Sequence, residues 1–446
     1  MVKNRIAVLG GGESGVGAAV LAKVKGFDVF LSDMSTLTSA YKKVLKKYDI
    51  PFEEGGHTWE NILNASEIIK SPGIPSTAPL VAKAIETGIP VISEIEFAGR
   101  YDTAKKICIT GSNGKTTTTS LIYYMLKNVG LNVGLGGNIG RSYAYQVATE
   151  HYDIYVLELS SFQLDNMYDF KADIAILLNI TPDHLDRYGY DLQNYVNAKF
   201  RITQNMAAED CFIFCSDDEI TIKNLNQIVI KAQMLPISQE REVAVGAYTL
   251  GGRMHVNYGG DPYEMPVADL SLQGKHNVYN TMAAALTGKL MNIKNESIRK
   301  ALTSFMPVEH RMEKVLSVRG VLYVNDSKAT NVNSTWYALE CMTTPVVLIL
   351  GGKDKGNDYS ALFDLVREKV KAIVCMGVDN TKIHAAFDDK VATIVDTASA
   401  VDAVKQASLL AKEGDTVLLS PCCASFDLFK SYEDRGQQFK EAVRNL

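Results

Sequence analysis

The stretch that decides the fold is ITGSNGKTT, residues 109–117. It follows a β-branched run and precedes a stretch of helical character, which is the setting of a phosphate-binding loop. The standard loop has four residues between its glycines, whereas Gly111 and Gly114 are separated by two. We expect the amides of this tighter loop to cradle phosphate, with Lys115 on the terminal phosphates and Thr116 on Mg²⁺. The plainer alternative is a helix N-cap after a glycine turn.

A second glycine turn, GGGESG at residues 10–15, fits the pattern G-x-G-x-x-G, and Asp33 ends the following strand. In this context, backbone amides and a helix N-terminus face a pyrophosphate. The pattern does not separate NAD from another diphosphate such as a UDP-sugar, and it also occurs in tight turns without a ligand. The turn SPGIP at residues 71–75 is either a plain turn or a further source of amides at the same sheet edge.

Short β-branched runs alternate with helical stretches along the chain, which is typical of parallel sheets covered by helices. The alternation begins near the N-terminus and restarts at residues 106–110 and again at residues 321–324. We therefore predict an α/β fold with three domains, at 1–94, 95–306 and 307–446. The first and third are expected to be Rossmann-like, and the second a P-loop ATPase-like parallel-sheet domain. The segment MHVNYGGDPYEM, within the second, indicates hairpins.

The composition is that of an ordinary globular protein, with 46% hydrophobic residues, 22% charged residues and a net charge of -5 in 446 residues. Because no block of like charge occurs, nucleic acid is not expected as a partner. The seven cysteines include no C-x-x-C pair, so the spacing suggests neither a disulfide framework nor a zinc site. Without a signal peptide or an apolar run of membrane-spanning length, we expect a cytoplasmic protein with no membrane span.

Three further side chains follow or neighbour the strands of the second domain. Glu158, in VLELSS, ends a strand, where a second metal ligand belongs, although a polar strand end is an equal alternative. His184, in NITPDHLDRY, follows another apolar strand; a loop histidine is more often a surface residue than a ligand. From its spacing alone, Lys199 is expected to be an ordinary solvated lysine on a helix.

Taken together, these motifs resemble those of the Mur ligases, ATP-dependent amide ligases of peptidoglycan precursor synthesis that are related to folylpolyglutamate synthase. The resemblance covers essentially the whole chain. It is carried by TGSNGKTT at 110–117, LELSSFQL at 157–164, NITPDHLDRY at 179–188, NAK at 197–199, GKHN at 274–277, EHR at 309–311, NDSKATN at 325–331 and LSP at 419–421.

Within the family, the chain is most similar to the member that adds D-glutamate to UDP-N-acetylmuramoyl-L-alanine. The similarity lies in the compact first domain with GGGESG, Asp33 and the SPG turn, and in Tyr188 closing DHLDRY. A sister ligase that adds another amino acid is the nearest alternative. From other classes, an NAD-linked oxidoreductase leaves the ATP loop unexplained, and a non-catalytic UDP-sugar-binding regulator leaves the intact Lys115, Glu158 and Lys199 unexplained. We expect a monomer.

The resemblance also implies site residues. It implies that Lys199 is carbamylated by CO₂ and helps to bridge two Mg²⁺ sites, and that the amide forms through an acyl phosphate. The implied catalytic residues are Lys115, Asn138, His184 and Lys199, and the metal ligands are Thr116, Glu158, His184 and Lys199. The implied ATP contacts are Gly111, Ser112, Asn113, Gly114, Lys115, Thr116, Thr117, Asn277, Arg311 and Asp326. Those for the UDP substrate are Gly12, Ser14, Gly15, Asp33, Ser71, Pro72, Gly73 and Asn138. Those for D-glutamate are Lys328, Thr330, Lys355, Ser425 and Tyr432. Whether Lys353 or Lys355 faces that pocket stays open, and Cys422 and Cys423 have no assigned role.

Overall fold

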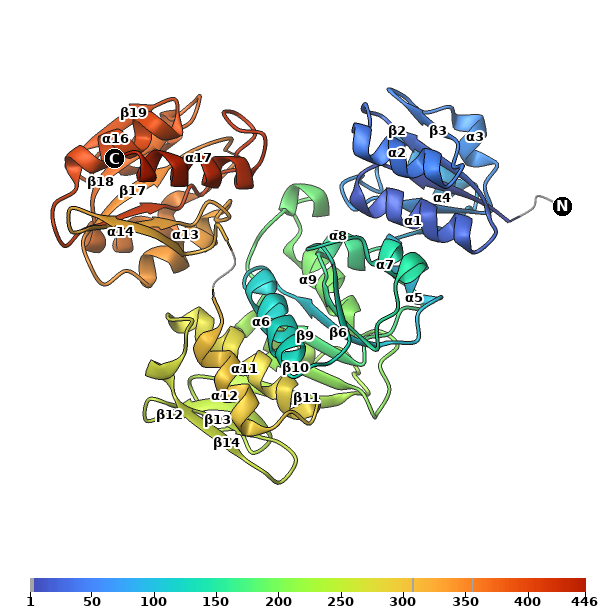
Figure 1. The fold of residues 1–446 in the computed structure, drawn as a ribbon, viewed down its shortest axis with the longest axis horizontal. Helices are drawn as coiled ribbons and strands as arrows, with labels where there is room; N and C mark the ends of the chain where they lie inside the picture. The colour runs from blue at the N-terminus through green and yellow to red at the C-terminus, as the bar shows by residue number, and fades with distance from the viewer. Residues whose placement is uncertain (1–3, 307–308, 355) are drawn as a thin grey trace. The chain divides into compact units, whose positions relative to one another are not determined.

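The structure is a computed structural model that describes residues 4–306, 309–354 and 356–446. It has three β-sheets with helices packed on them, so the predicted α/β class is confirmed (Figure 1). The chain forms two compact units. Unit 1 is Met1–Leu270 with Tyr279–Ser304, and unit 2 is Ser271–Val278 with Phe305–Leu446. The three domain ranges stay predictions, and the join expected at Pro307 lies outside the described residues.

The first sheet is parallel, with the strand order β3-β2-β1-β4-β5. This is the Rossmann order, which reverses between β1 and β4 and so opens a crevice at their carboxyl ends. Its strands are β1 (Arg5–Leu9), β2 (Asp28–Asp33), β3 (Phe52–Glu54), β4 (Glu67–Lys70) and β5 (Val91–Ile92). Its helices are α1 (Glu13–Val24), α2 (Ser39–Lys47), α3 (Trp59–Leu63), α4 (Pro79–Glu86) and α5 (Glu94–Gly99).

Side-chain alternation along β1 explains why helices cover both faces of this sheet. Ile6 and Val8 pack into one apolar cluster with α1, whereas Ala7 and Leu9 pack into another with α3 and α4. Successive residues of a strand point to opposite faces, so a continuous apolar run needs cover on both.

The central sheet has the order β14-β13-β12-β11-β10-β9-β6-β8-β7, with β6 between β8 and β9. The strands that carry the motifs end at one edge because β6, β8 and β9 are parallel. The strands are β6 (Lys105–Thr110), β7 (Val133–Gly137), β8 (Ile154–Glu158), β9 (Ile174–Leu177), β10 (Cys211–Cys215), β11 (Gln233–Ser238), β12 (Gly246–Leu250), β13 (Arg253–Asn257) and β14 (Tyr263–Pro266). The helices are α6 (Lys115–Asn128), α7 (Tyr143–Thr149), α8 (Ser161–Leu164), η1 (Leu185–Tyr188), α9 (Leu192–Phe200), η2 (Arg201–Thr203), α10 (Glu219–Leu225), η3 (Val267–Asp269), α11 (Lys275–Leu290) and α12 (Asn295–Ser304).

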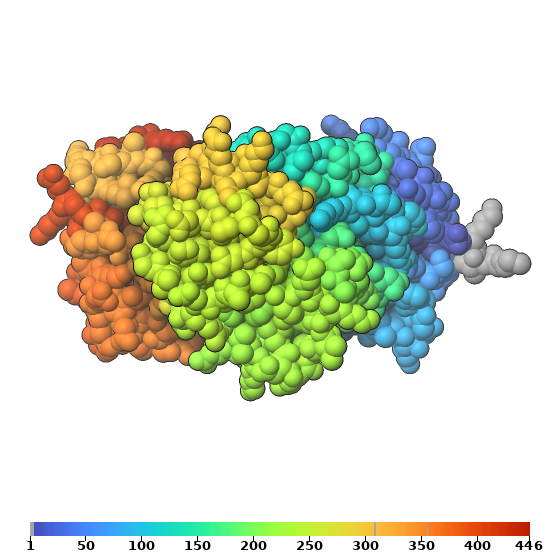
Figure 2. Space-filling model, turned by 90° about the horizontal axis from the view of Figure 1, so that it is seen from below, coloured from blue at the N-terminus to red at the C-terminus, as the bar shows by residue number. Residues whose placement is uncertain are grey.

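The predicted hairpins of the central sheet are confirmed, because β12, β13 and β14 pair antiparallel. The yellow-green atoms of this part of the chain form an outer surface of the molecule in the view of Figure 2. No candidate site residue lies in these strands. In the part of the chain that the structure describes, no helix combines the length and apolar character needed to cross a bilayer.

The third sheet has the order β15-β16-β20-β17-β18-β19, and all neighbours except β15 and β16 are parallel. Along β17, Val347 and Ile349 face α16 and α17, whereas Val346 and Leu348 face α13 and α14. Its strands are β15 (Glu313–Val318), β16 (Val321–Asn325), β17 (Val346–Leu350), β18 (Val370–Met376), β19 (Ile394–Thr397) and β20 (Thr416–Leu419). Its helices are α13 (Val332–Glu340), η4 (Tyr359–Leu362), α14 (Phe363–Lys369), α15 (Thr381–Phe387), α16 (Ala400–Leu410) and α17 (Tyr432–Arg444).

Candidate active site

The short glycine loop joins β6 to α6 at the edge of the central sheet. Gly114 caps α6 with a φ of 83°, a conformation that favours glycine. The Lys115 ammonium folds back over the loop and donates to the carbonyl oxygens of Gly111 at 2.8 Å and Ser112 at 3.0 Å. Thr116 is buried in the first turn of the helix. The loop therefore has the form predicted for a phosphate cradle, with its lysine held at the rim.

Glu158 ends β8, the neighbour of β6, and its side chain is only 1% exposed. Asn138 donates from Nδ2 to Glu158 Oε1 at 2.7 Å, and its backbone amide donates to the Glu158 carbonyl at 2.8 Å. The other carboxylate oxygen, Oε2, is buried and has no hydrogen-bond partner among the described residues. Burying a carboxylate oxygen without a hydrogen-bond partner costs free energy, and a cation bound beside Glu158 Oε2 would offset that cost.

His184 lies beyond β9, the other neighbour of β6. It caps the short helix η1 in the left-handed region, with a φ of 52°. Its ring meets Phe162 edge-on at 5.1 Å between centroids, and its Nε2 is 3.7 Å from a carboxylate oxygen of Asp183. The side chain is partly exposed, so a ligand can reach it.

The expectation that Lys199 is a solvated lysine is wrong. It lies on α9 but is only 1% exposed, and its ammonium donates to the Gly111 carbonyl at 2.7 Å. Its ammonium nitrogen also lies 4.6 Å from the centre of the Tyr195 ring. Burial lowers the pKa of Lys199 well below its usual value, and Lys115 adds to the shift. Spacing alone missed this because the helix packs its lysine inward, beneath the phosphate loop.

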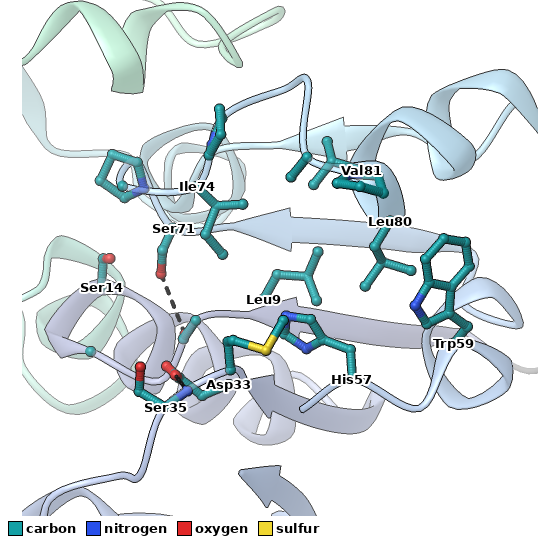
Figure 3. A pocket seen from close by; sticks show the side chains of 18 residues that line it. Leu9, Ser14, Asp33, Ser35, His57, Trp59, Ser71, Ile74, Leu80 and Val81 are labelled. Carbon is teal, nitrogen blue, oxygen red and sulfur yellow. Dashed lines mark hydrogen bonds between the residues drawn. The ribbon is translucent and has the colours of Figure 1, made fainter. Parts of the chain in front are cut away.

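The first glycine turn borders a cavity of about 670 Å³ at the switch point of the first sheet (Figure 3). Both predicted turns contribute to its lining, and Ser71 Oγ donates to the Gly10 carbonyl at 3.3 Å. Trp59 and Ile74 add aromatic and apolar surface. Of the residues predicted for the UDP substrate, those on this lining are Gly12, Ser14, Asp33, Ser71, Pro72 and Gly73.

Two predicted residues near this cavity have structural contacts of their own. A Cβ added at Gly15 would lie 1.8 Å from the Gly10 carbonyl oxygen, so only glycine allows α1 to approach the turn. Asp33 accepts hydrogen bonds from the backbone amides of Gly11 and Ser35 and thereby fixes the turn. A Cβ at Gly12 would meet nothing within 4 Å, which leaves this position open toward a ligand.

The residues predicted for adenine and ribose belong to unit 2, whereas the phosphate loop belongs to unit 1. Asp326 is buried and accepts from the Met312 amide at 3.2 Å and from Ser420 Oγ at 3.1 Å. Burial raises the pKa of Asp326 to about 7, against the opposing charge of Arg311. Asn277 donates from Nδ2 to the Gln273 carbonyl at 2.8 Å.

The residues predicted for D-glutamate also belong to unit 2. The Lys328 ammonium nitrogen lies 5.3 Å from the centre of the Tyr432 ring, and Ser425 is buried, whereas Thr330 is half-buried. Lys355 lies outside the described residues. Lys353 forms an isolated backbone bridge with Ala424.

Arg435 was not predicted as a functional residue. It is fully buried and donates to Ser327 and to the Cys423 carbonyl. Cys422 has a left-handed φ of 64°. The Cys422–Cys423 turn therefore presents its backbone to a buried guanidinium.

Two other residues with contacts to the glycine turns of unit 1 were also missed. A Cβ at Gly114 would lie 2.3 Å from Asn280 Oδ1, so this asparagine contacts the loop. It follows Asn277 by three residues on α11, a spacing that places both on one helix face and was available in the sequence. Arg187 donates to the Pro72 and Gly73 carbonyls and thereby links the DHLDRY segment to the first domain's second turn.

Known proteins resemble this chain over most of its length. Family models match as "MurD N-terminal domain" at residues 5–79, "Mur ligase middle domain" at 109–288 and "Mur ligase, glutamate ligase domain" at 310–423. The UDP-N-acetylmuramoylalanine--D-glutamate ligase of Bacteroides fragilis is 59% identical over 446 residues, covering 99% of this chain and 100% of the relative. The chain belongs to the Mur ligase family. The ligase of the same name from Cytophaga hutchinsonii is 50% identical, with both chains covered completely.

Solved Mur ligase structures share the fold at lower identity. The UDP-N-acetylmuramate-alanine ligase MurC from Thermotoga maritima has a TM-score of 0.63 at 17% identity, with 99% of each chain covered. MurF from the same organism, in complex with ADP, has a TM-score of 0.60 at 14% identity, covering 94% of this chain and 95% of MurF. As a Mur ligase, the chain is an ATP-dependent ligase, and the resemblance stated from its motifs is confirmed.

Proposed function

We propose that this Mur ligase joins the amine of D-glutamate to the alanyl carboxylate of UDP-N-acetylmuramoyl-L-alanine, with ATP as the driving reagent. The proposal places the reaction in the cytoplasm, where ATP and nucleotide-linked precursors are available. The observation that carries it is the arrangement of two buried side chains beside the short phosphate loop. They are Glu158, whose Oε2 has no hydrogen-bond partner among the described residues, and Lys199. The full-length relatives named UDP-N-acetylmuramoylalanine--D-glutamate ligase support the choice of substrates.

The reaction needs activation because a carboxylate repels nucleophiles. In the proposed first step, an alanyl carboxylate oxygen attacks the γ-phosphorus of ATP, so that an acyl phosphate forms and ADP leaves. The D-glutamate amine then attacks the acyl carbon, loses a proton and expels inorganic phosphate. The loop amides and Lys115, once it turns from its loop carbonyls to the phosphates, would neutralise the charge that develops.

The residues present fit Mg²⁺ at this edge of the sheet. Oxygen ligands suit Mg²⁺, and the buried Glu158 Oε2 and the Thr116 hydroxyl are of this kind. His184 would add an imidazole at a more exposed position. When bound, the cation neutralises phosphate charge. Asn138 would hold Glu158 in its orientation, since it contacts both the side chain and the backbone of that residue.

The buried position of Lys199 supports carbamylation. A neutral amine reacts with CO₂, forming an N–C bond and releasing a proton, and burial favours the neutral form of this lysine. The carbamate retains an N–H that can still donate to the Gly111 carbonyl. The product is a carboxylate in place of a cation, which suits a site for metal ions.

The cavity of the first sheet would hold the UDP moiety. Its volume is in the range of small-molecule sites, and it lies at the carboxyl ends of β1 and β4, where Rossmann-like sheets bind ligands. The diphosphate would lie over Gly12 and the N-terminus of α1. Asn277, Arg311 and Asp326 would contact adenine and ribose, and Lys328, Thr330, Ser425 and Tyr432 the D-glutamate.

The test is phosphate release from ATP and Mg²⁺ with UDP-N-acetylmuramoyl-L-alanine, offered with D-glutamate, L-glutamate, L-lysine or diaminopimelate in turn. Release with D-glutamate alone is expected. Release with another amino acid would show that the protein is a sister ligase that adds that amino acid instead. No release with any of them, under conditions where ATP binds, would overturn the proposal.

A further inference from the structure

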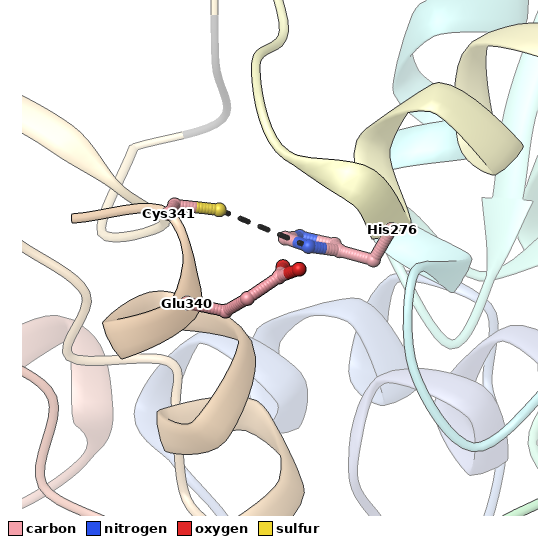
Figure 4. A group of neighbouring side chains, drawn as sticks. All are labelled: His276, Glu340 and Cys341. Atoms are coloured by element: carbon pink, nitrogen blue, oxygen red, sulfur yellow. Dashed lines mark hydrogen bonds between the residues drawn. The ribbon is translucent and has the colours of Figure 1, made fainter. Parts of the chain in front are cut away.

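Three side chains of metal-ligating type meet in unit 2, beside Asn277 but with no residue in common with the groups proposed for the reaction (Figure 4). They are His276 at the start of α11, Glu340 at the end of α13, and Cys341 directly after it. One ligand atom from each lies within 4.8 Å of the others, and Cys341 Sγ is 4.0 Å from His276 Nδ1. All three side chains are half-buried.

The local structure holds these groups in place. Lys369 donates to the carbonyls of Leu339, Glu340 and Met342, which fixes the end of α13. The His276 ring packs against Tyr337, one turn earlier on α13, with centroids 4.8 Å apart. These contacts therefore hold the His276 imidazole next to the C-terminal end of α13.

Glycine makes room for the thiol. Gly274 has a φ of 95°, and a Cβ there would lie 2.2 Å from Cys341 Sγ. The thiol consequently lies against the turn that begins α11, where its nearest polar neighbours are the Gln273 carbonyl and His276. Of the seven cysteines, Cys341 is the one that is not fully buried.

Glu340 provides an independent sign that a cation belongs here. Its Oε2 is buried and makes no hydrogen bond within the described ranges. Figure 4 shows its carboxylate directed toward the His276 ring. A buried carboxylate oxygen without a partner costs free energy, and a cation between the three ligands would remove that cost.

We propose that His276, Glu340 and Cys341 bind Zn²⁺. Thiolate, imidazole and carboxylate together suit Zn²⁺, whereas Mg²⁺ prefers oxygen ligands, so this site differs from the one at the phosphate loop. Ideal tetrahedral bonds place sulfur and nitrogen about 3.6 Å apart. The observed 4.0 Å separation needs only a small side-chain rotation to reach that value. The fourth position would take water.

Binding replaces the thiol proton of Cys341 with a sulfur–zinc bond and releases that proton to solvent, with no change of oxidation state. The bound ion would tie the start of α11 to the end of α13. The sequence could not indicate this site, because His276 and Cys341 are 65 residues apart and neither belongs to a paired ligand motif.

The test uses Co²⁺ as a spectroscopic substitute and Zn²⁺ in competition titrations on the full-length protein. The wild type is expected to show a thiolate-to-cobalt charge-transfer band that Zn²⁺ abolishes. Cys341→Ser should lose the band. Glu340→Gln and His276→Gln should each weaken Zn²⁺ binding by about tenfold or more. Circular dichroism would verify that each variant is folded.

The matched control is Asp396→Asn. This exposed residue belongs to the other cluster of potential ligands in the described chain, Cys375, His384 and Asp396, and the control should bind like the wild type. A band that persists in Cys341→Ser, or is lost in Asp396→Asn alone, would overturn the proposal. So would a wild type without any band. Zn²⁺ should also slow the reaction of Cys341 with a thiol reagent, and equal rates with and without the ion would count against the site.

Discussion

The two glycine turns of unit 1 begin from the same local design and end in different surroundings. Each follows a parallel strand and opens a helix, α1 in the first case and α6 in the second. The first borders an open cavity with apolar and aromatic walls. The second is closed over by Lys115 and has the buried Lys199 beneath it. A glycine turn supplies amides for phosphate, and the neighbouring segments decide which phosphate compound and which chemistry it serves.

The largest expected effect concerns the second turn. Lys199→Ala should lower kcat by about 100-fold or more, since it removes a charge-bearing group from the phosphoryl-transfer site. The fold should persist. Steady-state phosphate release and circular dichroism would measure both. Lys127→Ala, on the exposed part of α6, is the control and should retain normal turnover. Near-normal turnover in Lys199→Ala would show that the proposed carbamate has no part in the mechanism.

An intermediate effect is expected at the first turn. Gly12→Val should weaken binding of the UDP substrate by about tenfold while sparing ATP, because the added atoms point into open space rather than into the protein. Binding of each nucleotide by calorimetry would measure this. Gly15→Ala is the contrasting variant, because its Cβ would overlap the Gly10 carbonyl and distort the turn. Equal loss of ATP and UDP-substrate binding in Gly12→Val would indicate misfolding. It would then give no support for separate roles of the two turns in binding the UDP substrate and ATP.

The smallest effect concerns the attachment of the first turn to the central sheet. Glu13, which begins α1, accepts from the Ser142 amide at 3.0 Å, and the Ser142 hydroxyl donates to the buried Glu94 at 2.7 Å. Burial raises the pKa of Glu94 from 4.5 to about 7. Between these values the folded protein binds more protons than the unfolded chain, so its stability falls as pH rises and then levels off above about 7.

Glu94→Gln removes this titration. Urea unfolding across the same pH range should show that the wild type loses stability relative to the variant by about 1 kcal/mol per pH unit. Turnover at neutral pH should change little. Parallel stability curves for the two proteins would show that Glu94 does not change its protonation in this window.

The strands and the two turns were predictable because their signals are local. The predicted strand at residues 106–110 corresponds to β6, and the hairpin segment to β13 and β14. Helical spacing predicts that Asn277 and Asn280 share a face of α11, but the contact of Asn280 with Gly114 joins distant segments and depends on the tertiary structure. The burial of Arg435 and the meeting of His276 with Cys341 were out of reach, because each joins segments far apart in the chain.

The sequence by itself determined three series of parallel strands, the phosphate loop, the first glycine turn and the carboxylate that ends β8. These depend on side-chain periodicity and on backbone conformations that only glycine adopts readily, and both are properties of a few consecutive residues. The tertiary structure alone decided that Lys199 is buried and its charged form disfavoured. It also decided that Glu158 and Glu340 each keep a buried oxygen without a hydrogen-bond partner in the described part of the chain. Burial and charge environment are set by what packs around a group, and distant segments supply those neighbours.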